Sequence, residues 1–125
     1  SLKYFKFMST QNLYSDSLRE MLEQREKISL EEMKSFLSKL KCPNDKIDPI
    51  INGIIVDLIM GKLLPSGSPF NLLLQQIKEV VTNITREHLN DILEYMASKG
   101  WVRINKESDK IFKIKAPLPN CEINI

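Results

Sequence analysis

Histidine, cysteine and paired carboxylates are the side chains of this sequence that could catalyse a reaction or bind a metal. His88 is the only histidine, which excludes a metal site of several histidines and a two-histidine acid–base mechanism. Its place near the start of a predicted helix favours an exposed or capping residue over a catalytic one. Cys42 and Cys121 could pair, but two cysteines define no disulfide framework, and we expect free thiols.

Acidic pairs and glycine-rich loops give no catalytic signature either. Glu31 and Glu32 are adjacent, but at the start of a predicted helix they favour the helix dipole. The sequence contains no Walker-type phosphate loop, no G-x-G-x-x-G, no C-x-x-C and no G-x-S-x-G motif. We therefore predict a protein that is not an enzyme and that has no cofactor, no metal site and no small-molecule substrate.

A helix predicted over 85–99 presents the first candidate binding surface. Its apolar residues recur at helical spacing and leave six positions facing outward: Arg86, Glu87, Asn90, Asp91, Glu94 and Ser98. This face carries one basic residue and three acidic ones. It is therefore unsuited to insertion into a DNA groove, because contacts with phosphates supply most of the non-specific affinity for DNA. We predict that it binds a protein partner through Arg86, Asn90, Asp91 and Glu94. The basic segment that follows would add contacts from Arg103, Lys106 and Lys110.

Basic residues are concentrated in the segment that follows this helix. Six basic residues against two acidic ones give residues 99–115 a net charge of +4, whereas residues 51–98 carry −2. Such a segment can lie along phosphates, and this predicts nucleic-acid binding through Arg103, Lys106, Lys110, Lys113 and Lys115. The alternative is that these side chains form only the solvated face of a hairpin and protect its edge.

A two-stranded hairpin is predicted at this place in the chain. Gly100 stands where a left-handed residue ends a helix, and residues 101–104 and 110–115 alternate as strands around a polar turn over 105–109. Trp101 is expected to seal the hairpin onto the helices. The alternative role for Trp101 is an anchor for a partner.

Capping signals mark the starts of three helices. Ser17–Glu20 and Ser29–Glu32 both fit the capping box, in which the serine and the glutamate satisfy early backbone N–H groups. Thr85 or Asn83 can cap the helix over 85–99.

Apolar residues place a buried helix in the middle of the chain. Residues 47–64 are apolar on nearly every face, as in a central helix, although exposed apolar surface there would allow self-association. The Pro- and Gly-containing segment 65–69 ends it, and a one-sided helix follows over 69–82. Residues 2–8 predict a short strand or an ordered arm, whose aromatic side chains cover the core or form an interface: Tyr4, Phe5 and Phe7.

Length and composition bound the chain to one ordinary domain. The sequence has 125 residues, 42% of them hydrophobic and 27% charged, and its net charge of +2 is too small to attract nucleic acid by itself. We predict a single domain over 1–125, with 1–64 and 69–125 as candidate sub-units. The apolar run over 50–64 is interrupted by polar residues and is shorter than the roughly 20 residues of a membrane span, so we expect a soluble intracellular protein.

The end of the predicted helix and the hairpin resemble a known superfamily. ILEYMASKGWV over 92–102 and DKIFK over 109–113 are similar to winged-helix domains, and among them to the C-terminal domain of the middle subunit of replication protein A and its telomere-capping paralogue. Cullin ends, proteasome-lid-type subunits, kleisins and meiotic chromosome-axis proteins share the pattern. The resemblance covers about a quarter of the chain.

This resemblance implies both a fold and a function. The fold is mainly α, an extended winged helix-turn-helix with a small antiparallel β-wing, because helices over 47–64 and 69–82 exceed the needs of a minimal three-helix domain. The function is a nuclear, non-enzymatic interaction module of a DNA-handling complex, in DNA replication, at telomeres or on chromosomes, that recruits a protein partner. Binding to DNA through the wing is the alternative.

Overall fold

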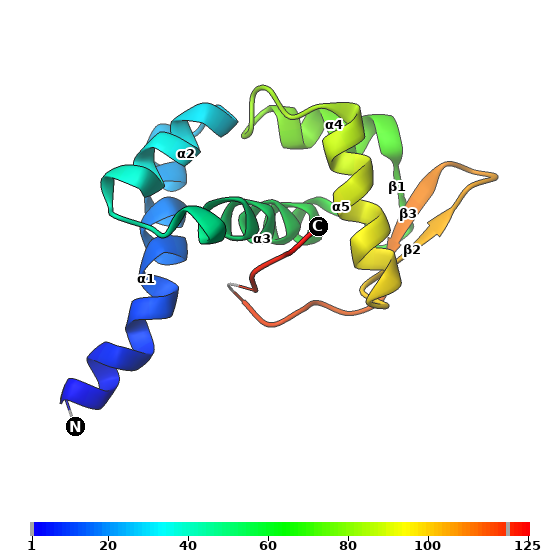
Figure 1. Cartoon of the computed structure of the whole chain (residues 1–125). Coiled ribbons are helices and arrows are strands. Elements are labelled where there is room, and N and C mark those ends of the chain that lie inside the picture. The colour runs from blue at the N-terminus through cyan, green and yellow to red at the C-terminus, as the bar shows by residue number, and fades with distance from the viewer. Residues whose placement is uncertain (1, 120) are drawn as a thin grey trace.

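Helices form most of the molecule, and a small sheet lies at one end of it (Figure 1). The computed structural model describes residues 2–119 and 121–125, with side chains from residue 13 onward. The helices are α1 (Leu2–Arg25), α2 (Leu30–Lys39), α3 (Asn44–Lys62), α4 (Phe70–Lys78) and α5 (Arg86–Ser98). The strands are β1 (Ser68–Pro69), β2 (Val102–Asn105) and β3 (Lys110–Lys113). The predicted mainly α fold with a small antiparallel wing is confirmed.

The sheet connects the segment before α4 to the hairpin after α5. Its strand order is β1-β3-β2, and both pairs are antiparallel. β2 and β3 form the predicted hairpin, in which Arg103 lies opposite Phe112 and Ile104 opposite Ile111. β1 was not predicted, because two residues are too few to show an alternating pattern. Together with α3, α4 and α5, this sheet completes an extended winged helix-turn-helix.

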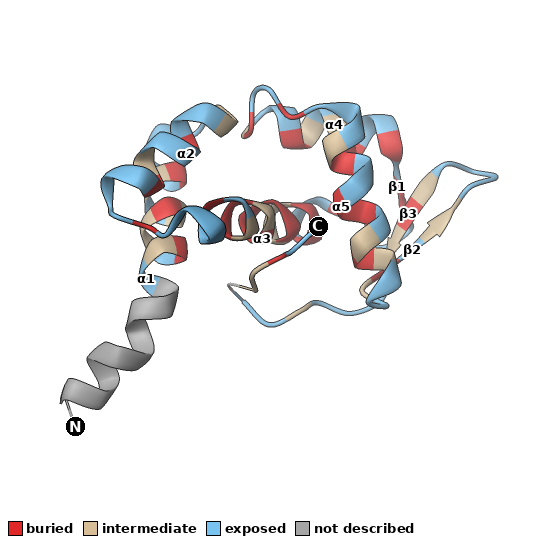
Figure 2. Ribbon diagram, viewed as in Figure 1, coloured by how far each residue is buried: buried red, intermediate tan, exposed pale blue. Residues whose placement is uncertain are grey.

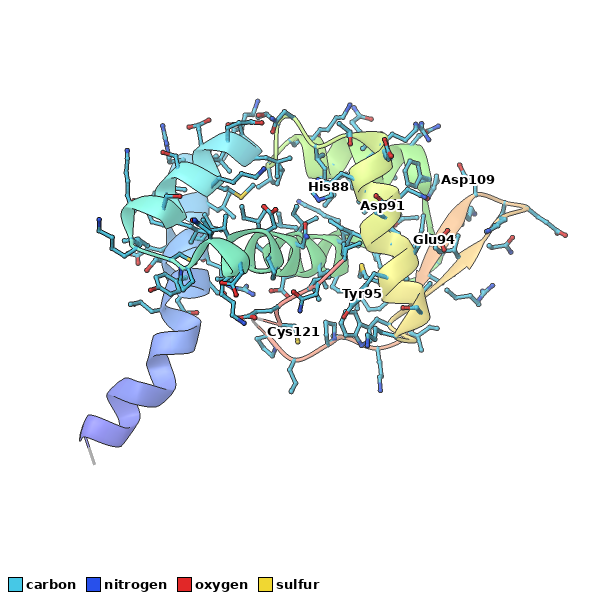
Figure 3. All side chains as sticks on the ribbon, in the orientation of Figure 1. His88, Asp91, Glu94, Tyr95, Asp109 and Cys121 are labelled. Atoms are coloured by element: carbon cyan, nitrogen blue, oxygen red, sulfur yellow. The ribbon has the colours of Figure 1, made fainter. Side chains whose placement is uncertain are left out.

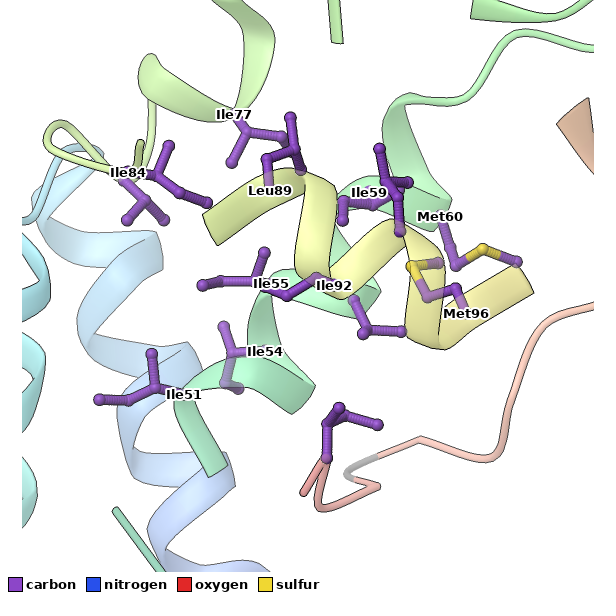
Figure 4. Packing of buried hydrophobic residues seen from close by; sticks show 14 of the residues in the cluster. Ile51, Ile54, Ile55, Ile59, Met60, Ile77, Ile84, Leu89, Ile92 and Met96 are labelled. Carbon is purple, nitrogen blue, oxygen red and sulfur yellow. The ribbon is translucent and has the colours of Figure 1, made fainter. Parts of the chain in front are cut away.

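α3 is the central helix, as its sequence predicts. It packs against α1, α2, α4 and α5 and buries apolar side chains on every turn (Figure 2): Ile47, Ile50, Ile51, Ile54, Ile55, Val56, Ile59 and Met60. Figure 4 shows several of them beside Ile92 and Met96 of α5. The hydrophobic cluster includes residues from both 1–64 and 69–125.

Self-association through α3 loses its basis once these side chains are buried. Within 47–64, Leu64 is the large hydrophobic residue that the structure leaves exposed, at 42%, and it lies beyond the end of the helix. α3 therefore lacks the exposed apolar surface that self-association would need.

Capping residues set two helix boundaries as predicted. Ser29 caps α2 with a complete capping box, because its Oγ accepts a hydrogen bond from the Glu32 N–H and the Glu32 carboxylate accepts one from the Ser29 N–H. Thr85 caps α5 through a hydrogen bond from the His88 N–H to its Oγ1, at 3.0 Å. Gly100 follows α5 with a φ of +75°, in the left-handed region.

α4 is shorter than the helix predicted over 69–82, because the residues after it pair with the segment before α2. Ile28 and Val81 form a parallel β-bridge. The Ile28 N–H donates a hydrogen bond to the Val80 carbonyl oxygen at 2.8 Å, and the Thr82 N–H donates one to the Ile28 carbonyl oxygen at 3.0 Å. Asn83, the alternative cap for α5, instead accepts a hydrogen bond from the Leu30 N–H, at 2.8 Å. This pairing attaches the α4–α5 connection to the start of α2.

Two predictions for the amino-terminal segment are wrong. Residues 2–8 form no strand but belong to α1, and the side chains of Tyr4, Phe5 and Phe7 lie outside the described residues. α1 also continues through Ser17–Glu20, so this second capping box begins no helix. A capping serine needs a non-helical backbone, and the residues before Ser17 are already helical.

After β3 the chain returns from the wing to α3 (Figure 1). Ile123 is buried there, and its N–H donates a hydrogen bond to the carbonyl oxygen of Pro49 at 3.1 Å. Lys46 and Glu122 form an ion pair of 3.0 Å beside it. Ile123 thus adds to the core at the amino-terminal half of α3.

Candidate interaction surfaces on α5 and the wing

α5 buries one face and exposes the other. Its buried residues are Leu89, Ile92, Leu93 and Met96. The six positions predicted to face outward are all exposed: Arg86, Glu87, Asn90, Asp91, Glu94 and Ser98. Figure 3 shows Asp91 and Glu94 on neighbouring turns of α5. We call these exposed side chains the α5 face.

A groove lies between the start of this face and the wing. It has a volume of about 440 Å³ and is lined by Phe70, Arg86, Glu87, Asn90 and Asp109. The Phe70 N–H donates a hydrogen bond to the Asp109 carbonyl oxygen at 2.9 Å, which fixes the end of the wing turn against the start of α4. The Arg86 guanidinium lies 4.8 Å from the centre of the Phe70 ring and donates a hydrogen bond to Asn71 Oδ1.

The four residues predicted to bind a partner fall into two positions. Arg86 and Asn90 line the groove, whereas Asp91 and Glu94 lie on the α5 face outside its lining. Phe70 and Asp109 complete the groove, and sequence analysis missed both as site residues. Their proximity depends on the pairing of β1 with β3, which left no pattern in the sequence.

His88 has a structural position that the sequence did not reveal. It is half-buried and not exposed, and its Nε2 lies 2.9 Å from Asn52 Oδ1, so it connects α5 to α3. Burial lowers the pKa of His88 from its ordinary value of 6.5, while Asp91 and Asp48 act in the opposite direction and Lys34 adds to the lowering. Its backbone N–H also donates to the Thr85 cap, as a residue near a helix start can.

The two faces of the wing have different composition. Val102 and Ile111 are buried on the inner face, toward the helices. The outer face carries Arg103 opposite Phe112 and Asn105 opposite Lys110. The Arg103 guanidinium lies 4.4 Å from the centre of the Phe112 ring. The sheet therefore presents an aromatic ring with a cation stacked on it.

The five predicted nucleic-acid-binding residues do not share one face. Arg103 and Lys110 lie on the outer face, whereas Lys113 is paired with Val102 on the other side of the sheet. Lys106 lies in the turn, and Lys115 follows β3. Four of the five are exposed and Lys110 is half-buried.

Trp101 packs as predicted between the wing and α5. It is half-buried against the core, and its ring meets that of Tyr95 edge-on, with 6.0 Å between the centroids. Its carbonyl oxygen accepts hydrogen bonds from the N–H groups of Ile114 and Lys115. Trp101 thus holds the base of the wing against the helices.

The ion pairs within the described residues neutralise neither the carboxylates of the α5 face nor the basic side chains of the wing. The ion pairs there are Arg19–Asp57, Arg25–Glu32, Lys34–Asp48 and Lys46–Glu122. None involves a carboxylate of the α5 face or a basic side chain of the wing. An acidic surface and a basic surface therefore lie side by side without pairing with each other.

Outside these surfaces we searched the described part of the chain for reactive thiols, metal-binding clusters and membrane-spanning helices. Cys42 and Cys121 are free thiols there, and burial raises the pKa of Cys42, with Glu122 and Asp45 adding to the effect. No group of three or more potential ligands could hold a metal ion among residues whose side chains are described. No helix in the same part of the chain has the length and apolarity needed to cross a membrane.

Comparison with known proteins assigns this chain to no family. Neither a family model, nor a curated protein, nor a solved structure matches this chain.

Proposed function

We propose that this protein is a non-enzymatic interaction module that recruits a protein partner through the α5 face and the adjoining groove. The observation that carries the proposal is the set of exposed carboxylates on α5, which form no ion pair among the described residues. The groove beside them provides Phe70 and the polar groups of Arg86 and Asn90. A partner with basic and apolar side chains would complement both features.

The charge of the α5 face also explains why a partner protein fits better than a DNA groove. Glu87, Asp91 and Glu94 would all approach phosphates if α5 entered the major groove, and no gain from counterion release would offset that repulsion. Arg86 is the basic residue of this face, and it is already engaged by Phe70 and Asn71.

The resemblance of residues 92–113 to a replication protein A winged helix supports a more specific proposal. The module would act in a nuclear complex that handles DNA, in replication, at telomeres or on chromosomes. The resemblance is the sole support for this location and context, whereas the interaction surface rests on the geometry of α5.

A charge-reversal experiment tests recruitment. The tagged domain and its Asp91→Lys/Glu94→Lys variant are incubated with nuclear extract, and the retained proteins are quantified by mass spectrometry. A Glu20→Lys/Glu23→Lys variant is the matched control, because it changes the charge equally on an exposed part of α1. We expect a specific partner to be lost from the α5 variant and kept by the control. Equal retention by both variants would refute the proposal.

Nucleic-acid binding through the wing is a second candidate function. It is favoured by the basic side chains that take part in no ion pair within the described residues: Arg103, Lys106, Lys110, Lys113 and Lys115. Affinity for a labelled oligonucleotide should then fall about tenfold or more between about 50 and 200 mM salt. Lys106→Glu/Lys113→Glu should weaken it, and Lys39→Glu/Lys62→Glu, exposed but outside the wing, should not. Unchanged binding by the wing variant would end this candidate.

A further inference from the structure

Arg103 and Phe112 form a cation–π pair on the outer face of the wing, which we call the platform. They lie directly opposite each other on β2 and β3, and the guanidinium lies 4.4 Å from the ring centre. Phe112 is half-buried and its ring occupies the space beside Gly67 that a Cβ there would need. Arg103 is exposed. The ring is thus confined by Gly67, and the exposed Arg103 side chain lies over it.

Two basic side chains lie toward the turn end of this platform, and the turn also carries Glu107 and Asp109. Lys110 lies on the same face two residues before Phe112 in β3, about 7 Å away along the strand. Lys106 follows in the turn, and neither lysine has an ion-pair partner among the described residues. A stacking surface and phosphate-binding cations are therefore within the reach of one or two nucleotides.

We propose that the outer face of the wing binds single-stranded nucleic acid, with an unpaired base stacked on the Arg103 guanidinium and the neighbouring phosphates near Lys106 and Lys110. Guanidinium planes and aromatic rings are common stacking partners of unpaired bases, and stacking tolerates any base because every base has a π-face. A duplex does not offer such a base, since its bases are stacked on each other. The inference rests on the second candidate function and adds the form of nucleic acid and the means of recognition.

The contact with Phe112 holds Arg103 in position before a base binds, which favours Arg103 as the stacking residue. A guanidinium on a ring is held in place before a ligand arrives, so fewer rotamers are lost on binding than for a free side chain. Arg86 provides a comparison within the same protein, because it also lies over a phenylalanine ring, at 4.8 Å from its centre. Arg86, however, also donates a hydrogen bond to Asn71, so its guanidinium is already engaged by a second side chain.

Fluorescence anisotropy with three oligonucleotides of equal length tests the proposal: oligo-dT, an abasic strand with the same phosphates, and a duplex. At about 50 mM salt we expect the protein to bind oligo-dT about tenfold more tightly than the abasic strand and the duplex. Arg103→Lys keeps the charge but removes the plane, so oligo-dT affinity should fall to the abasic level while abasic affinity stays unchanged. That unchanged affinity also shows that the variant is folded. Arg86→Lys is the control and should alter none of the three.

Each other result overturns a defined part of the proposal. Equal affinity for oligo-dT and the abasic strand would refute base stacking but leave phosphate binding by the wing intact. Duplex binding as tight as oligo-dT binding would refute the preference for single strands. Retained preference for oligo-dT in Arg103→Lys would refute the role of Arg103. No binding of any oligonucleotide would refute both this inference and the second candidate function.

Discussion

The carbonyl oxygen of Cys121 lies against Gly53, in the space that a Cβ at position 53 would occupy. Two further contacts hold the same stretch of chain on α3, because Ile123 bonds to the Pro49 carbonyl and Glu122 pairs with Lys46. Since residues 46, 49 and 53 share one face of the helix, residues 121–123 bind along that face. The missing side chain of Gly53 is what allows the backbone to approach α3 so closely.

Gly53→Ala should therefore destabilise the protein although alanine favours helices. The clash with the Cys121 carbonyl must displace the returning segment, at a cost of about 1–3 kcal/mol. Gly61→Ala is the matched control, because it lies on the same helix with nothing near its Cβ, and it should gain up to about 1 kcal/mol. The free energy of unfolding in denaturant measures both. Equal shifts for the two variants would contradict the close contact.

Ser29→Ala should lower the free energy of unfolding by about 1 kcal/mol, since it removes the cap of α2. Ser17→Ala should change it by no more than about 0.5 kcal/mol, because Ser17 has the same sequence pattern but lies within α1. Denaturant unfolding of both variants checks this. A loss at Ser17 as large as the loss at Ser29 would show that α1 begins near residue 17.

These two serines also show how far local sequence determines this fold. The capping box at Ser29 predicted the start of α2 correctly, because its hydrogen bonds form within four residues. The identical box at Ser17 misled, because a local pattern cannot report whether the preceding turn is helical. The returning segment was not predicted for a related reason. Its partner, Gly53, lies far away in the sequence and carries no side chain that would mark a contact.

Some features of the candidate site could also be predicted from the sequence, whereas others could not. Helical periodicity was enough to predict which residues of α5 are exposed, including Asp91 and Glu94. The groove was not predictable, because Phe70 and Asp109 meet only through the pairing of β1 with β3. The stacking of Arg103 on Phe112 needed the hairpin register, which the sequence pattern did not specify to the residue.

His88 should make the protein less stable as the pH falls from about 7 to 5. Burial lowers its pKa below the ordinary 6.5, so the unfolded chain binds more protons in this window and acid favours unfolding. Asp91 on α5 and Asp48 on α3 oppose this effect, and Lys34 on α2 adds to it. The contribution of His88 is fully present above pH 6.5 and is lost as the pH falls through the lowered pKa.

His88→Gln tests this pH dependence, because glutamine can still donate a hydrogen bond to Asn52 but does not titrate. We expect the unfolding free energy of the variant to vary less between pH 7 and pH 5 than that of the unchanged protein. Denaturant titrations at several pH values provide the comparison. Parallel curves for the two proteins would show that His88 is not responsible.

Gly67→Ala should destabilise the wing more than Gly100→Ala does. Both glycines are left-handed, with φ of +93° and +75°, so alanine costs about 1–2 kcal/mol at either position. At Gly100 the added Cβ meets open space, whereas at Gly67 it collides with the Phe112 ring and adds about 1–3 kcal/mol. Unfolding free energies of the two variants give the difference directly.

Displacement of Phe112 also moves the support of Arg103, so oligo-dT binding should weaken in Gly67→Ala and persist in Gly100→Ala. If both variants bind oligo-dT equally well, the position of the Phe112 ring does not control the platform.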